Sequence, residues 1–151
     1  MDARDIEIRL ESKMISDVLE KFSITNRYGL EIVGEIRIPK NPIGCSFVIH
    51  GLGGFKEQPN TMAMVDTLFD NNYVVINFDA TNSFGESGGK YENATMQLHY
   101  EDLVDVINWT KEQSWYREPF VLAGRDLLLV TIKTVCSGNS PVRTYWSNAS
   151  G

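Results

Sequence analysis

The chain has 151 residues, enough for one domain with a sizeable buried core. Apolar residues make up 42% and charged residues 23%, values ordinary for a globular protein, and the formal net charge is −6. The sequence therefore predicts no nucleic-acid partner, since it has no basic patch, and no membrane span, since no apolar run is long enough. Two cysteines, Cys45 and Cys136, do not make a disulfide framework, and we expect a reducing, cytoplasmic location.

The first predicted element is a charged N-terminal arm, residues 1–19, in which Met1 and Met14 are alternative starts. Two runs of alternating apolar and polar residues follow, at residues 22–24 and 30–38. Period-two alternation is typical of strands with one face in water, and a turn separates the two runs. The sequence therefore predicts an antiparallel hairpin after the arm.

Three short and nearly continuous apolar runs come next, and such runs suit parallel strands that are covered on both faces. The runs are residues 45–49, 73–78 and 120–123. Between them lie two segments with apolar residues at helical spacing. The apolar faces are Met62, Val65, Leu68 and Phe69 in the first helix, and Met96, Tyr100, Leu103 and Ile107 in the second. Asn93 is the expected cap of the second helix. Alternating strands and helices predict a parallel sheet with right-handed crossovers.

A glycine-rich motif directly follows the first apolar run, with the sequence His50-Gly51-Leu52-Gly53-Gly54. Acyl transfer needs backbone N–H donors aimed at a developing oxyanion, and glycines let the backbone approach a substrate closely. The motif therefore favours an oxyanion-binding loop. A glycine-rich turn with a structural histidine is the alternative.

A second polar, glycine-rich segment, residues 77–89, follows the next strand, which ends near Asp79. Residues 85–89 match the nucleophile pattern Gly-x-Ser-x-Gly, with Ser87 as the serine. A nucleophile elbow, however, places its serine on a sharp turn from a strand directly into a helix. Because the strand ends several residues too early, we interpret Ser87 as a decoy and Asp79 as structural.

The two motifs together, in this order and spacing, resemble the α/β-hydrolase superfamily over about residues 20–124. The likeness is to its serine aminopeptidase-like and esterase/lipase-like branch. The resemblance implies an incomplete α/β-hydrolase sheet of about five strands, an antiparallel hairpin followed by parallel strands with crossover helices. By the same resemblance the backbone N–H of Leu52 would donate to an oxyanion, within a loop that includes Gly51 and Gly53. His50 would be structural.

The run at residues 120–123 resembles the strand that presents the family's nucleophile, but the pattern stops just after it. Gly124 matches the first glycine of the elbow, and Arg125 follows. Asp126 occupies the serine position, and Leu128 stands where a glycine relieves close packing in the turn.

Residues 125–151 form a divergent tail without an acid and a histidine in the family's usual order. A change of reading frame near Arg125 is one hypothesis for this tail, and a truncation or a chimera are the others. The only histidines are His50 and His99. We expect His99 to lie exposed on the second helix.

The leading prediction is a truncated serine hydrolase, ancestrally acting on a small-molecule carboxylic ester or an amide and inactive as this chain. Its domain organisation would be an arm (1–19), a partial hydrolase domain (20–124) and the tail (125–151). One alternative is a non-catalytic binding fragment that uses the loop at residues 52–55. Another is a hydrolase with Asp126 as nucleophile, resembling haloalkane dehalogenases and epoxide hydrolases. We expect no cofactor and no metal, and self-association through an exposed sheet edge.

Overall fold

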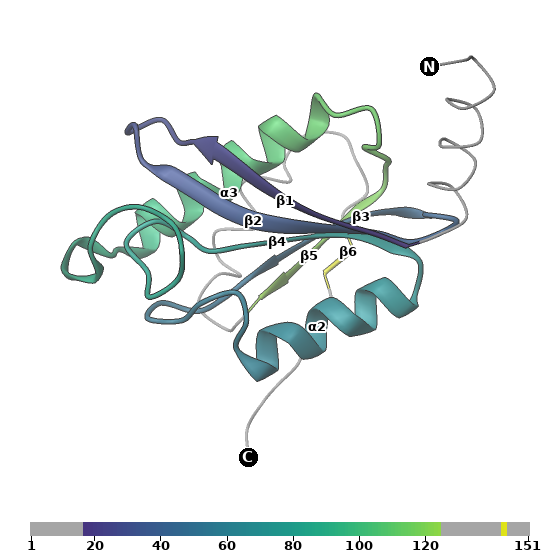
Figure 1. Cartoon of the computed structure of the whole chain (residues 1–151), viewed down its shortest axis with the longest axis horizontal. Helices are drawn as coiled ribbons and strands as arrows, with labels where there is room; N and C mark the ends of the chain where they lie inside the picture. The colour runs from purple at the N-terminus through teal and green to yellow at the C-terminus, as the bar shows by residue number, and fades with distance from the viewer. Residues whose placement is uncertain (1–16, 125–142, 145–151) are drawn as a thin grey trace, which may run out of the picture.

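A computed structural model describes residues 17–124 and 143–144, which form one mixed sheet with helices on both sides (Figure 1). The strands are β1 (Val18–Thr25), β2 (Glu31–Ile38), β3 (Gly44–Ile49), β4 (Tyr73–Phe78), β5 (Phe120–Gly124) and β6 (Arg143–Thr144). The helices are α2 (Pro59–Asp70), α3 (Met96–Lys111) and the short 3₁₀ turn η1 (Tyr91–Asn93). Within these ranges no helix is both long and apolar enough to cross a lipid bilayer.

The predicted hairpin is confirmed, since β1 and β2 pair antiparallel along their full length. Strand β1 begins at Val18, inside the range expected to be the arm. Gly34 of β2 lies opposite Phe22 of β1, and a Cβ at Gly34 would lie 2.5 Å from the Phe22 ring. The missing side chain lets Phe22 stack on Trp109 of α3 with ring centroids 4.7 Å apart. A glycine therefore allows the hairpin to pack closely on the helix.

The sheet has the strand order β1-β2-β4-β3-β5-β6, so the chain crosses over between its parallel strands. Strand β3 pairs parallel with β4 on one side and with β5 on the other, while β2 pairs antiparallel with β4. The expected incomplete α/β-hydrolase sheet is thereby confirmed. Among the described residues a sixth strand, β6, adds a two-residue parallel pairing to β5. The expected sheet of about five strands is confirmed in β1 to β5, and β6 adds two residues to it.

Helices α2 and α3 cover opposite faces of the sheet (Figure 1). On one face, Val65 and Leu68 of α2 pack against Val48, Val75 and Val121 of three strands. On the other face α3 packs on the larger core. Its buried apolar residues there are Leu103, Val106 and Ile107. Because each central strand is buried on both faces, its sequence reads as a continuous apolar run, as expected.

The cap of α3 differs from the prediction. Thr95, not Asn93, is its N-cap, and the Thr95 side chain accepts a hydrogen bond from the Leu98 N–H at 3.2 Å. Asn93 ends η1 instead. A hydroxyl or amide side chain satisfies a free N–H only when it directly precedes the first helical turn, and the intervening 3₁₀ turn displaces Asn93 from that place.

The parallel register determines where the two motifs meet. Ile49 at the end of β3 is paired with Phe78 at the end of β4. The next residues, His50 and Asp79, therefore leave the sheet side by side at its carboxyl edge. Ligand loops of parallel sheets occupy this edge.

Candidate functional site

The loop after β3 is a tight turn that only glycines can complete. The Gly54 N–H donates to the Gly51 carbonyl oxygen at 2.9 Å, and Gly53 has a φ of +78°. A positive φ at the third position of such a turn favours glycine. A Cβ at Gly54 would lie 2.5 Å from Gln58 Oε1 and 3.0 Å from the Gly51 carbonyl oxygen, so a larger residue there requires the Gln58 side chain to move. Among the described residues, the backbone N–H of Leu52 has no hydrogen-bond acceptor.

His50 holds this turn to the end of β4. Its side chain is fully buried, and its Nε2 accepts a hydrogen bond from the Ala80 N–H at 3.0 Å. Nε2 can accept only without a proton, so the proton is on Nδ1, which donates to the Gly51 carbonyl oxygen at 2.8 Å. Burial lowers the pKa of His50, against the opposing influence of the Gly51 bond and of Asp79. His50 is therefore a neutral, structural histidine whose two ring nitrogens both form hydrogen bonds.

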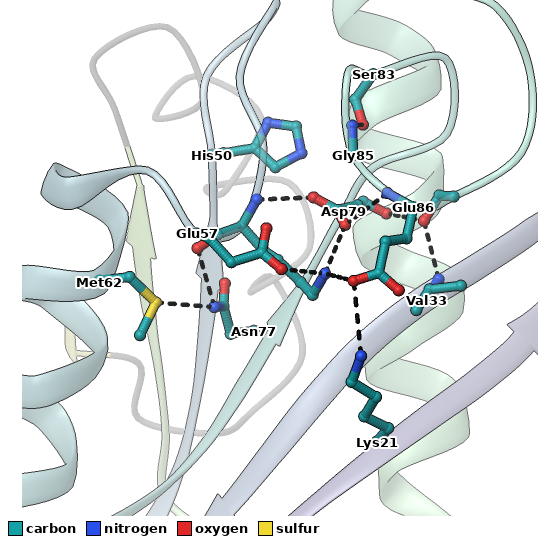
Figure 2. Close-up of polar contacts among 12 residues, drawn as sticks. Lys21, Val33, His50, Glu57, Met62, Asn77, Asp79, Ser83, Gly85 and Glu86 are labelled. Carbon is teal, nitrogen blue, oxygen red and sulfur yellow. Dashed lines mark hydrogen bonds and ion pairs between the residues drawn. The ribbon is translucent and has the colours of Figure 1, made fainter.

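Asp79 fastens the other end of the loop. One carboxylate oxygen accepts the Lys56 N–H at 2.7 Å, and the other accepts the Lys56 ammonium at 2.9 Å and the Glu86 N–H at 3.0 Å. The side chains of Asp79 and Lys56 are both fully buried. The single carboxylate therefore joins the loop after β3 to the loop after β4 (Figure 2).

Two further carboxylates complete what we call the Asp79–Lys56 cluster, which consists of Asp79, Lys56, Glu57 and Glu86. The Lys56 Nζ lies 2.7 Å from Glu57 Oε1 and 2.8 Å from Glu86 Oε1. Burial by itself would lower the pKa of Lys56, but the hydrogen bonds from its ammonium to the three carboxylates outweigh burial and raise that pKa. The Lys56 ammonium in turn lowers the pKa of Glu86. Sequence reasoning did not single out Lys56, because no local pattern reveals a buried lysine.

Ser87 links the loop after β4 to strand β2. Its hydroxyl donates to the Asp79 carbonyl oxygen at 2.6 Å and accepts the Val33 N–H at 2.8 Å. The Gly88 N–H donates to the Glu31 carbonyl oxygen at 2.8 Å. A Cβ at Gly85 would lie 2.0 Å from the Asp79 carboxyl carbon. The residue types that spell a nucleophile pattern here are thus those that pack a loop against Asp79 and strand β2.

The expectation that His99 is exposed is wrong. Its side chain is fully buried, and its ring meets the His50 ring edge-on with centroids 5.3 Å apart. Neither His99 nitrogen has a hydrogen-bond partner among the described residues, and the nearby Gly51 carbonyl does not reach hydrogen-bonded geometry. Burial, with a smaller effect of His50, lowers the pKa of His99 to about 4. The sequence predicted that His99 lies on the polar side of the helix. The loop after β3 covers this side, so His99 is buried there.

A second buried carboxylate, Asp102 of α3, was also missed. It accepts hydrogen bonds from the Asn26 side chain at 2.9 Å and from the N–H and hydroxyl of Thr81, each at 2.7 Å. Burial raises the pKa of Asp102 in spite of these bonds. The contact ties α3 and the hairpin turn to the segment that follows Asp79, so the helix is fixed relative to the loops.

The other proposed site residues divide into two groups. Leu52, Gly51, Gly53 and His50 lie together in the turn after β3, whereas Asp126 lies outside the described residues. Within residues 17–124, no group of three or more histidine, cysteine or acidic side chains is arranged to hold a metal ion.

We expect Asp79→Asn to lower the free energy of unfolding by about 2–4 kcal/mol, because an amide turns one donor toward the buried Lys56 ammonium and the Glu86 N–H. Urea unfolding followed by circular dichroism measures the change. Glu57→Gln is the matched control, since Glu57 is half exposed, and it should change stability by less than about 1 kcal/mol. Equal effects of the two substitutions would contradict a central role for Asp79.

We expect His99→Phe to reduce the acid sensitivity of the fold. The pKa of His99 is 6.5 in the unfolded chain and about 4 in the folded protein. Between these two pH values the unfolded chain therefore binds more protons than the folded protein. Stability is therefore fully present above pH 6.5 and falls as the pH decreases toward about 4. As the pH falls from 6.5 to about 4, the wild type should lose about 1–3 kcal/mol more of its free energy of unfolding than His99→Phe does. Urea unfolding at several pH values measures this difference. Parallel pH profiles would show that His99 does not titrate as a buried group.

Solved structures with a similar fold include hydrolases from archaea, bacteria and fungi. Esterase Pf2001 from Pyrococcus furiosus superposes with a TM-score of 0.70 at 20% identity over 85% of this chain and 51% of that one. Est1E from Butyrivibrio proteoclasticus, solved with ferulic acid bound, gives 0.65 at 20% identity over 74% and 45%. The α/β-hydrolase GrgF from a Penicillium species gives 0.64 at 18% identity over 71% and 37%.

No family model and no curated protein matches the sequence. The chain spans about half, or less, of the length of each of these three structures. At such identities the likeness concerns the fold. The strand order, the crossover helices and these superpositions together identify the described part of the chain as a partial α/β-hydrolase fold.

Proposed function

We propose that this chain is the oxyanion-binding part of a carboxylic ester hydrolase. The observation that carries the proposal is the backbone N–H of Leu52, which lies in a glycine turn and has no acceptor within the described part of the chain. A donor of this kind stabilises a developing oxyanion only when it is held in place before the reaction. Support for such preorganisation comes from His50 on one side of the turn and from the Asp79–Lys56 cluster on the other.

Hydrolysis through a serine would require that nucleophile together with a histidine base. His50 does not fit the role of base, since both its nitrogens are engaged. His99 is fully buried against the His50 ring. We therefore propose that this chain by itself hydrolyses esters at no more than a trace rate, although the ancestral protein was a serine hydrolase.

Two other functions follow from particular residues. A non-catalytic binding fragment would use the same turn and the exposed Leu52 side chain. A hydrolase with Asp126 as nucleophile would form an ester intermediate on that carboxylate, but it needs a base to activate water. Of these two, the hydrogen-bonded geometry of the turn favours the binding fragment.

Hydrolysis of para-nitrophenyl butyrate by the full chain tests the proposal against these alternatives. We expect turnover indistinguishable from that of the unfolded chain, and no change in Ser87→Ala or Asp126→Asn. Turnover blocked by a serine-directed phosphonate and lost in Ser87→Ala would instead indicate a serine enzyme that uses Ser87. Turnover lost in Asp126→Asn alone would indicate the aspartate mechanism.

The coding DNA tests the origin of the departure after Gly124. We propose that the reading frame changes near Arg125, and we expect another frame to continue with a serine, a nearby glycine and later an aspartate and a histidine. Sequencing from the Phe120 codon onward decides this. If no frame restores those residues, the proposal of a frame change is wrong. A truncation or a chimera then explains why the sequence differs from the family pattern after Gly124.

Two further properties are proposed from composition and fold. Among the described strands, β6 forms one edge of the sheet, and an edge strand can pair with a second copy of the chain. Self-association through this edge is therefore part of the proposal. A cytoplasmic location is proposed from the cysteine content, which does not make a disulfide framework.

A further inference from the structure

Large apolar side chains remain exposed around the turn that carries the free Leu52 N–H. Leu52 is 43% exposed, Phe84 63% and Tyr91 46%. The Phe84 and Tyr91 rings stack with centroids 4.4 Å apart and an angle of 29° between their planes. The Tyr91 hydroxyl oxygen lies 3.1 Å from the place of a Cβ at Gly53. These contacts put the aromatic stack beside the turn, and clustered exposed apolar groups mark binding sites.

Both rings are exposed, so burial contributes little to their position. Hydrogen bonds of the neighbouring loop residues fix the backbone that carries the rings. The Ser83 hydroxyl accepts the Gly85 N–H at 3.2 Å next to Phe84. The Asn82 side chain accepts the Lys90 N–H at 2.9 Å next to Tyr91. Gly53, with a positive φ and no side chain, leaves room for the Tyr91 hydroxyl. The loop thus presents two flat rings to solvent in a fixed arrangement, which reduces the entropy lost on binding.

Charges around the stack favour a neutral ligand. Glu57 and Glu86 are about half exposed in the neighbouring loops, and the whole chain has a net charge of −6. The two exposed residues beside Tyr91, Lys90 and Glu92, have opposite charges, so acidic groups outnumber basic ones around the stack. The Lys56 ammonium is fully buried and already contacts three carboxylates, so it does not attract an external anion. An uncharged ester is therefore favoured over the free carboxylate that its hydrolysis would give.

We propose that Phe84 and Tyr91 form a platform for the planar aromatic group of a neutral carboxylic ester, whose carbonyl oxygen accepts the Leu52 N–H. This assignment rests on the proposed function and names the substrate class of the same site. Aromatic rings bind one another best in offset stacks, a geometry in which a planar ring makes closer contact with the exposed face of this pair than a puckered aliphatic ring does.

Titration of the ¹⁵N-labelled full chain with methyl benzoate tests the platform, with methyl cyclohexanecarboxylate as the matched non-planar ligand. We expect methyl benzoate to shift the amide signals of Leu52 and Gly53 and the ring signals of Phe84 and Tyr91. We expect it to bind roughly threefold to tenfold more tightly than the non-planar ester. Equal affinity for the two esters would overturn the platform.

Substitutions separate the platform from the oxyanion donor. Phe84→Leu and Tyr91→Leu should each weaken methyl benzoate binding by roughly threefold to tenfold. Tyr28→Leu, which removes an exposed aromatic ring on the β1–β2 turn, should leave it unchanged. Amide shifts at Leu52 that persist undiminished in both platform variants would overturn the platform and leave the proposed function intact.

The converse results are equally decisive. Ring shifts at Phe84 and Tyr91 without a shift at the Leu52 amide would support an aromatic binding surface but overturn the placement of the ester carbonyl, and with it the proposed function. No shift at any of these residues would overturn both proposals.

Discussion

The buried pair of Asp79 and Lys56 is the constraint on which the edge of the sheet depends. Two charges taken out of water are expensive to bury, and well-packed apolar residues in their place are often at least as stabilising. Apolar residues, however, form no directional hydrogen bonds. The Asp79 carboxylate accepts two backbone N–H groups and an ammonium, so the positions of two loops relative to the strands are fixed by hydrogen bonds of defined geometry. The pair therefore contributes more to the shape of the site than to the free energy of unfolding.

The same constraint explains why a nucleophile pattern occurs where no nucleophile elbow exists. The chain leaving β4 must pass over the Asp79 carboxylate, where only a glycine fits. It must also satisfy the Val33 N–H of β2 beyond the last paired residue of β4, which the Ser87 hydroxyl does. Glycine and serine at this spacing therefore follow from packing and hydrogen bonding. Letter patterns acquire chemical meaning only with the strand and helix around them.

Much of the fold could be predicted from sequence because it depends on local periodicity. The hairpin has period two, the central strands are apolar runs and the helices carry apolar faces, each readable within a short window. The errors concern polar residues. Lys56, His99 and Asp102 are buried because of partners distant in the sequence, and a single sequence does not display those contacts. Thr95 caps α3 in place of Asn93 because a 3₁₀ turn at Tyr91–Asn93 precedes the helix, and local periodicity does not reveal such a turn.

Within the described part of the chain, residues 50–91 supply the contacts that hold the turn after β3. His50 reaches Ala80, Lys56 reaches Asp79 and Glu86, and Tyr91 contacts Gly53. None of these partners belongs to the segment after Gly124, where the family's nucleophile, acid and base would follow. The turn after β3 is therefore held without any contribution from that segment, and the binding that we propose for this turn does not depend on the residues that would carry out the chemistry.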